Sequence, residues 1–149
     1  MLLNRPKLKF GVSDLLLAAA AILFFIGIRA WFPVCAATEE HVMSCHWAGE
    51  TLKAVSLLNL VLAVVHFALP EASGKLGMDV ALLGLAVLTA CVPGRVIGLC
   101  QSAEMHCRAL TQPWTVAFGI AQCLLALADG ACYLSLRARE RHHRSKAGG

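Results

Sequence analysis

Charged residues are scarce in this chain. Asp, Glu, Lys and Arg make up 15% of its 149 residues, whereas apolar residues make up 58%. An average soluble domain has about 25% charged and about 45–50% apolar residues. The apolar residues are also gathered into long blocks rather than spread at the spacing of a soluble core. These two features exclude an ordinary soluble globular domain.

Several motifs are also missing. The sequence contains no phosphate-binding glycine loop, no hydrolytic triad and no carboxylate pair, which excludes the common kinds of soluble catalysis. It has no Cys-x-x-Cys-His site for covalent haem and no zinc-finger spacing. The apolar blocks show no strict alternation, which excludes a transmembrane β-barrel.

Four apolar blocks approach or exceed the roughly 20 residues that cross a hydrocarbon core of about 30 Å. Backbone amides in lipid must be paired within the segment, so each block is predicted to be a helix. The first is longer than the core of a secretory signal, about 7–15 residues, and is predicted to be retained. We therefore predict a single all-α domain over residues 1–149, an integral membrane four-helix bundle. Its spans are 13–33, 51–69, 78–97 and 114–136, its outer loops 34–50 and 98–113, and its tail 137–149.

Basic residues predict the orientation, because they accumulate on the cytoplasmic side. Nine of the thirteen lie in the N-terminal segment, the connection between spans two and three, or the tail: Arg5, Lys7, Lys9, Lys75, Arg137, Arg139, Arg141, Arg144 and Lys146. Both termini are therefore predicted to be cytoplasmic, in a multi-pass protein of the cell (plasma or inner) membrane. The net charge of +4 is thus a topology signal. The predicted contact is the lipid bilayer, and no nucleic-acid partner is expected.

The second half of the chain repeats a pattern of the first. Met43-Ser44-Cys45-His46-Trp47 is followed 62 residues later by Met105-His106-Cys107-Arg108. Both halves cross the membrane in the same direction. The sequence therefore predicts two parallel repeats of a helical hairpin.

Polar residues recur at matching depths in spans two and four. Asn59 and His66 lie seven residues apart, as do Gln122 and Asp129, so each pair shares one helix face. An unpaired polar group in lipid costs several kcal/mol, so we expect all four to face the bundle interior. The first interpretation is hydrogen bonding between helices; a proton path through His66 and Asp129 is the alternative.

Seven cysteines are unevenly placed. Cys91, Cys123 and Cys132 lie within spans, where they behave as small apolar residues. Cys35, Cys45, Cys100 and Cys107 lie in the two outer loops, where an oxidising exterior permits disulfides. We favour the pairs Cys35–Cys45 and Cys100–Cys107, and pairing across the loops is the alternative.

The same loops carry soft-metal ligands. They are Cys35, His41, Met43, Cys45 and His46 in the first loop, and Cys100, Met105, His106 and Cys107 in the second. Thiolate, thioether and imidazole suit Cu(I) and Zn(II). A shared metal site at the outer face is therefore an alternative to two structural disulfides.

The loop motifs also carry two resemblances. Four spans with two outer cysteine pairs resemble the quinone-linked disulfide-forming membrane oxidoreductases, although the Cys-x-x-Cys of those enzymes is missing. Phe32-Pro33-Val34-Cys35, Met43-x-Cys45-His46-Trp47, Ile97-Gly98-Leu99-Cys100 and Met105-His106-Cys107 resemble an uncharacterised prokaryotic family of small four-span proteins. That resemblance implies an accessory role beside an ABC transporter.

We therefore expect a membrane accessory protein with a cysteine-rich outer cap, not an enzyme. The alternative is a thiol–disulfide oxidoreductase that uses Cys35, Cys45, Cys100 and Cys107, with Arg95 or Arg108 stabilising a thiolate or a reduced quinone. A simple pore is disfavoured, because four helices enclose little space.

Overall fold

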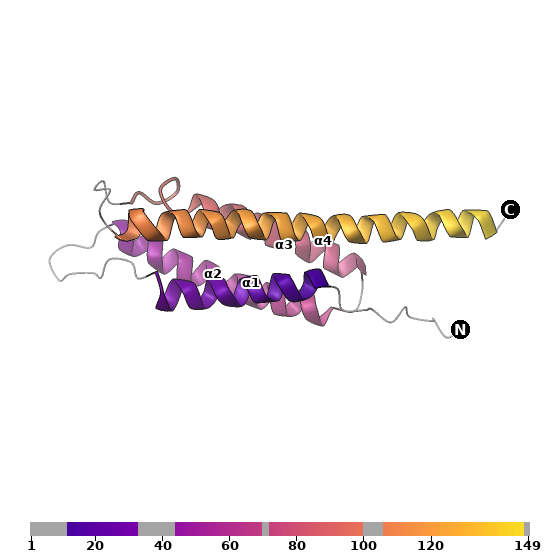
Figure 1. The fold of residues 1–149 in the computed structure, drawn as a ribbon, viewed down its shortest axis with the longest axis horizontal. Coiled ribbons are helices and arrows are strands. Elements are labelled where there is room, and N and C mark those ends of the chain that lie inside the picture. Colours follow the sequence, from indigo (N-terminus) through magenta and orange to yellow (C-terminus); the bar gives the residue numbers. More distant parts are fainter. Residues whose placement is uncertain (1–11, 33–43, 70–71, 100–105, 148–149) are drawn as a thin grey trace.

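The protein is helical throughout its regular structure. A computed structural model describes residues 12–32, 44–69, 72–99 and 106–147. These form α1 (Val12–Ala30), α2 (Ser44–Ala68), α3 (Ala72–Cys91) and α4 (Gln112–Ala147), and a five-residue π-helical turn, η1 (Cys107–Thr111), leads into α4. The predicted all-α class is confirmed (Figure 1).

Four segments are long and apolar enough to cross a membrane. They are Val12–Ala30, Ser44–Ala68, Gly74–Cys91 and Cys107–Arg139. This finding confirms the prediction of a multi-pass membrane protein with four transmembrane helices. The apolar surface of these helices is in contact with the lipid bilayer.

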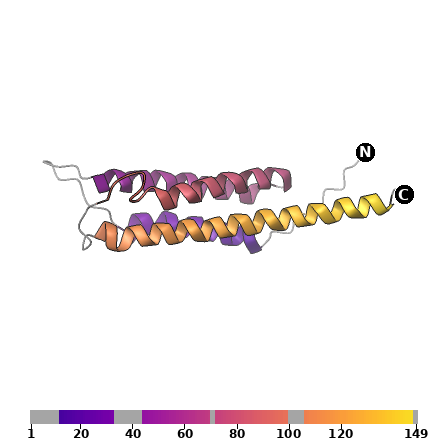
Figure 2. The same cartoon turned by 90° about the horizontal axis from the view of Figure 1, so that it is seen from above.

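The four helices form a closed bundle. Each packs against its neighbours in the sequence, and α1 also packs against α4. Figure 1 shows α1 beside α2 and α3 beside α4, and the turned view in Figure 2 shows α1 with α4 and α2 with α3. Consequently α1 and α3 are diagonal partners, as are α2 and α4. The C-terminal part of α4 extends past the other helices (Figure 2), so the predicted tail continues the helix as far as Ala147.

The bounds of α2 and α3 also differ from those that the sequence predicts. α3 covers 72–91 instead of 78–97, and α2 begins at Ser44 instead of Thr51. α3 ends before Pro93, which has no N–H to donate, and the following turn contains Gly94 at φ +88°. Val96 N–H donates to the Cys91 carbonyl at 3.1 Å, and Ile97 N–H donates to the Val92 carbonyl at 3.0 Å. Pro93 therefore follows the end of α3 and does not lie within a longer helix.

The bundle is apolar outside and has a mixed interior. Leu15, Val64, Leu124 and Leu127 are about half exposed or more. Beside apolar side chains such as Phe24 and Leu52, the interior contains eleven buried polar or charged side chains among the described residues: Asp14, Ser56, Asn59, His66, Lys75, Asp79, Thr89, Thr111, Thr115, Gln122 and Asp129. Lipid chains solvate apolar side chains but offer polar side chains no hydrogen-bond partner. Apolar side chains can therefore face the bilayer, whereas polar side chains are more stable inside the bundle.

The tryptophans mark one end of the bundle. Trp31 follows α1, Trp47 lies in the first turn of α2 and Trp114 in the first turn of α4, and all three are exposed. α1 ends, and α2 and α4 begin, at the same end in both views (Figures 1 and 2). Amphipathic rings at this position are typical of the aromatic belt at a membrane–water interface. We call this the tryptophan end.

Helices α3 and α4 approach closely at one glycine. A Cβ at Gly119 would lie 2.7 Å from the Ala86 carbonyl oxygen and 2.8 Å from Ala90 Cβ. A Cβ at Gly84 or Gly98 would meet nothing within 4 Å. Gly119 therefore allows the close approach of α3 and α4, whereas Gly84 and Gly98 are not needed for any close contact.

Gly119→Ala is therefore expected to destabilise the bundle, because the new methyl must push α4 away from the α3 backbone. The expected cost is about 1–3 kcal/mol. Gly84→Ala is the matched control: it adds the same methyl group to open space and should be neutral or stabilising by up to about 1 kcal/mol. Thermal unfolding in detergent measures both. Equal effects of the two substitutions would contradict the close contact.

Candidate functional site

The strongest concentration of chemistry lies inside the bundle. Asp14 of α1, His66 of α2, Lys75 and Asp79 of α3, and Asp129 of α4 are all buried, none of them more than 4% exposed. We call these five residues the ionisable cluster. Every helix contributes to it, so the cluster forms only when the whole bundle is assembled.

The cluster lies at the end of the bundle opposite the tryptophans. Asp14 is in the first turn of α1 and His66 in the last turn of α2. Asp14 and Trp31 are separated by roughly 25 Å at about 1.5 Å per residue. The hydrocarbon core is about 30 Å thick, so the cluster lies close to the second membrane surface. By the distribution of basic residues this surface is the predicted cytoplasmic one.

Lys75 and Asp14 form a direct ion pair across the bundle. Lys75 Nζ donates a hydrogen bond to Asp14 Oδ2 at 2.6 Å, and both side chains are fully buried. The pair joins the diagonal partners α3 and α1. Nζ also lies 5.6 Å from the centroid of the Tyr133 ring on α4. Sequence analysis places Lys75 in a cytoplasmic connection; the structure corrects this, because Asp14 compensates the ammonium group inside the bundle.

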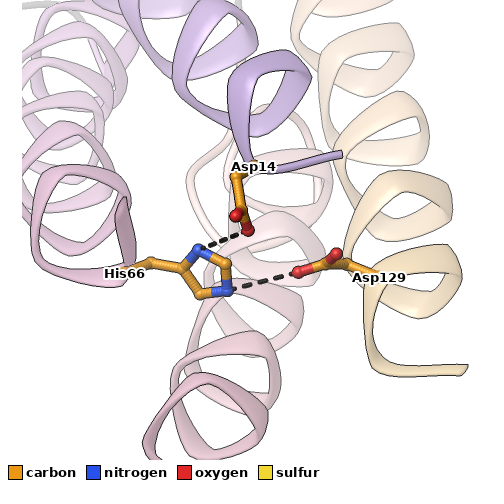
Figure 3. Close-up of side chains that lie close together, drawn as sticks. All are labelled: Asp14, His66 and Asp129. Carbon is orange, nitrogen blue, oxygen red and sulfur yellow. Dashed lines mark ion pairs between the residues drawn. The ribbon is translucent and has the colours of Figure 1, made fainter. Parts of the chain in front are cut away.

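His66 occupies the centre of the cluster. Its Nδ1 lies 3.6 Å from Asp14 Oδ1, and its Nε2 lies 3.0 Å from Asp79 Oδ1 and 3.3 Å from Asp129 Oδ2. Figure 3 shows the ring between Asp14 on one side and Asp129 on the other. The second oxygen of Asp129, Oδ1, accepts a hydrogen bond from the Ser13 hydroxyl. The imidazole is therefore surrounded by carboxylates from three helices.

The charges of the cluster do not balance. Three carboxylates face one lysine, so full ionisation leaves two negative charges with His66 neutral and one with His66 protonated. Neither carboxylate oxygen of Asp79 has a hydrogen-bond partner among the described residues. An uncompensated buried charge costs several kcal/mol. The cluster must therefore hold either extra protons or a cation.

A second polar layer lies about 10 Å nearer the tryptophan end, two helical turns from His66. Asn59 Nδ2 donates to Gln122 Oε1 at 2.7 Å, and Gln122 Nε2 donates to Asn59 Oδ1 at 2.6 Å. These bonds join the diagonal partners α2 and α4. Burial of Asn59, His66, Gln122 and Asp129 confirms the prediction that they face the interior.

The contacts also follow the predicted repeat. Asn59 bonds Gln122 and His66 faces Asp129, and these are the positions that the repeat makes equivalent. Equivalent residues touch each other only near an axis that relates the two halves. The repeat itself stays a prediction.

The predicted outer-loop site is described only in part. Cys45 and Cys107 are completely buried, at the tryptophan end. The His46 ring packs edge-on against Trp47 with centroids 5.9 Å apart, and His106 is exposed. The remaining predicted ligands, Cys35, His41, Met43, Cys100 and Met105, lie outside the described residues. The disulfide pairing and the soft-metal site therefore stay predictions.

The sequence predicts two of the five members of the ionisable cluster, His66 and Asp129, as interior groups. Asp14 and Asp79 are not predicted, Lys75 is expected in a connection, and no carboxylate pair is expected. The structure corrects the last expectation, because three aspartates that are far apart in the chain meet at one histidine. The missed signal was simple: the chain has only three aspartates, and all three lie in or beside predicted spans.

Comparison with known proteins gives one match. The chain matches a family described as a domain of unknown function, DUF4418, over residues 17–132. The matched segment contains His66, Lys75, Asp79 and Asp129, whereas Asp14 precedes it. No curated protein and no solved structure matches the chain.

Lys75→Met should destabilise the protein strongly, because it leaves Asp14 buried without its ammonium partner. Removing one member of a buried pair costs about 3–5 kcal/mol. The double variant Asp14→Asn/Lys75→Met removes both charges and should recover most of that loss. The free energy of unfolding in detergent, measured for the wild type, the single variant and the double variant, tests this recovery. Lys53→Met is the control, because Lys53 makes an exposed pair with Glu50; it should change stability by about 1 kcal/mol or less.

The amide pair gives a smaller effect of the same kind. Gln122→Leu should cost about 1–2 kcal/mol, since Asn59 loses its partner in a dry interior. Asn59→Leu/Gln122→Leu should be more stable than either single variant, because no buried amide remains. A double variant that shows simple addition of the two losses would contradict a direct interaction.

Proposed function

This chain belongs to the family described as a domain of unknown function, DUF4418, and we propose that it is a small membrane accessory protein that carries a cysteine-rich cap. The cap comprises the outer loops together with the first turns of α2 and α4. Its proposed role is to hold a soft metal, Cu(I) or Zn(II), or to contact a partner such as an ABC transporter. The basic residues of the opposite end favour an extracytoplasmic position for the cap.

The observation that carries the proposal is the placement of Cys45 and Cys107. Both thiols are completely buried at the tryptophan end, and each lies in the first turn of a helical segment. A helix N-terminus stabilises a thiolate, the form that binds metals. Two such sites at one end of the bundle support a shared structure formed by both hairpins.

The neighbouring residues suit the same chemistry. His46 follows Cys45 and His106 precedes Cys107, so each thiol has an imidazole beside it in the sequence. Met43 and Met105 each precede a cysteine by two residues. Sulfur and imidazole ligands together favour Cu(I) or Zn(II) over Mg²⁺ or Ca²⁺. Disulfides Cys35–Cys45 and Cys100–Cys107 would instead give a purely structural cap for protein contact.

The second candidate is a thiol–disulfide oxidoreductase. The helix N-termini favour it for the same electrostatic reason, because a stabilised thiolate is also a better leaving group. In this alternative one cysteine pair accepts two electrons from a client dithiol and passes them to the other pair and on to a quinone. A single Cys→Ser substitution in the pair that reacts with the client would then trap a mixed disulfide with that client.

The thiol state of the purified protein separates these functions. Alkylation under denaturing conditions, with and without reductant, counts oxidised cysteines by mass, and metal content is read on the same sample. Thiols with one equivalent of copper or zinc support the metal cap. Two disulfides without metal support the structural cap, and a trapped client supports the oxidoreductase.

The metal cap predicts a defined effect of thioether removal. Met43→Leu/Met105→Leu should weaken Cu(I) binding about tenfold or more, since each lost ligand contributes more than about 1 kcal/mol. Leucine nearly preserves the side-chain volume. Met78→Leu in α3 is the matched control and should leave the affinity unchanged, because Met78 lies far from the cap. An unchanged Cu(I) affinity in the double variant would show that Met43 and Met105 are not ligands.

A further inference from the structure

We propose that the ionisable cluster is a binding site for one first-row divalent cation such as Zn²⁺, with His66 Nε2, Asp79 and Asp129 as its ligands. The site is separate from the cap, because it lies at the opposite end of the bundle. It joins α2, α3 and α4 through the ion and α1 through Asp14.

Charge favours a divalent ion. Lys75 already compensates Asp14 at 2.6 Å. That leaves Asp79 and Asp129, two carboxylates beside one imidazole, all of them buried. A divalent cation bound to a neutral His66 and two ionised carboxylates makes the whole cluster neutral. A proton on His66 alone leaves one negative charge uncompensated in a low-dielectric interior.

The distances fit ligands of a common ion. Bonds of about 2.0–2.1 Å from Zn²⁺ to nitrogen or oxygen place tetrahedral ligand atoms about 3.3 Å apart. His66 Nε2 lies 3.0 Å from Asp79 Oδ1 and 3.3 Å from Asp129 Oδ2. None of these three atoms has a hydrogen-bond partner among the described residues, in spite of the short separations. The two separations are those of ion pairs with a protonated His66, and they are equally those of ligand atoms around one ion when His66 is neutral.

The surrounding groups hold these ligands in place. Metal-binding histidines donate their other ring N–H to a carboxylate, which fixes the ring. His66 Nδ1 faces Asp14 Oδ1 at 3.6 Å (Figure 3), and Lys75 holds the other oxygen of Asp14. The Ser13 hydroxyl binds Asp129 Oδ1 and leaves Oδ2 directed at His66. Asp14 is itself close enough to be an alternative ligand, because one ligand atom each from Asp14, His66 and Asp129 lies within 4.8 Å of the others. Its ion pair with Lys75 is the reason that we assign the third position to Asp79 instead.

Asp79 is the observation that separates this site from an ordinary buried ion-pair network. It is 4% exposed, and neither of its carboxylate oxygens has a hydrogen-bond partner among the described residues. Its one printed ion pair is with His66 Nε2 at 3.0 Å, so its negative charge is uncompensated whenever His66 is neutral. One nitrogen and two oxygen ligands suit Zn²⁺, Co²⁺ or Mn²⁺, whereas Mg²⁺ prefers oxygen ligands alone.

Metal binding by the full-length chain tests the proposal. Protein in detergent is stripped with a chelator, loaded with Zn²⁺ and desalted, and bound zinc is measured by mass spectrometry. The wild type should hold one equivalent more than Asp79→Asn or Asp129→Asn, since either substitution removes a ligand without changing its size. Glu50→Gln, an equal charge change at an exposed position near the tryptophan end, is the control and should hold as much zinc as the wild type.

Co²⁺ distinguishes this site from the cap. Cobalt bound to thiolate has intense near-ultraviolet charge-transfer absorption, whereas cobalt bound to imidazole and carboxylate shows only weak visible bands. The wild type should show the weak visible bands, and Asp79→Asn should lose them. Ser13→Ala should keep them but bind about 10–100-fold more weakly, because Ser13 only positions Asp129.

The outcomes decide the proposal even if an asparagine variant fails to fold. In that case the wild type alone is informative: the visible cobalt bands and a Zn²⁺-dependent rise in its unfolding temperature support the site. Equal zinc content in the wild type and Asp79→Asn overturns it. So does a wild type that binds cobalt only through thiolate or not at all, and the cluster is then a network neutralised by protons.

Discussion

The buried ion pair between Lys75 and Asp14 constrains the rest of this bundle. Neither group can enter a membrane interior alone, since an isolated charge there is very costly. Together they oblige the start of α1 and the start of α3 to lie diagonally opposite each other. Once these two helices are placed, α2 and α4 fill the remaining corners, and the cluster closes around His66.

The two polar layers perform different tasks. The amide pair of Asn59 and Gln122 is complete: each side chain donates to and accepts from the other, so no group is left over. The ionisable cluster is incomplete, because it has more carboxylates than cations and Asp79 has no hydrogen bond to any other described residue. A buried polar network in which every atom has a partner fixes the packing of its helices. A network with unpaired carboxylates can in addition bind an ion or a proton.

The two ends of the bundle thus carry different chemistry. The tryptophan end has the buried cysteines Cys45 and Cys107 near helix N-termini, and the opposite end has an imidazole among carboxylates. A small apolar core of Phe24, Ile28, Leu52 and Val92 also lies in the bundle, with Phe118 packed against it.

The sequence by itself determined the number of spans, the all-helical class and the inward direction of four polar residues, because a bilayer leaves apolar runs of about 20 residues only one backbone solution. It determined less well where helices begin and end. Lys75 looks like a loop residue until its partner is known, and Pro93 looks like a kink until Gly94 turns the chain. The meeting of Asp14, Asp79 and Asp129 at His66 was decided only by the tertiary structure. These residues come from four helices, and hydrophobic periodicity says which face points inward but not which residues of other helices lie at the same depth.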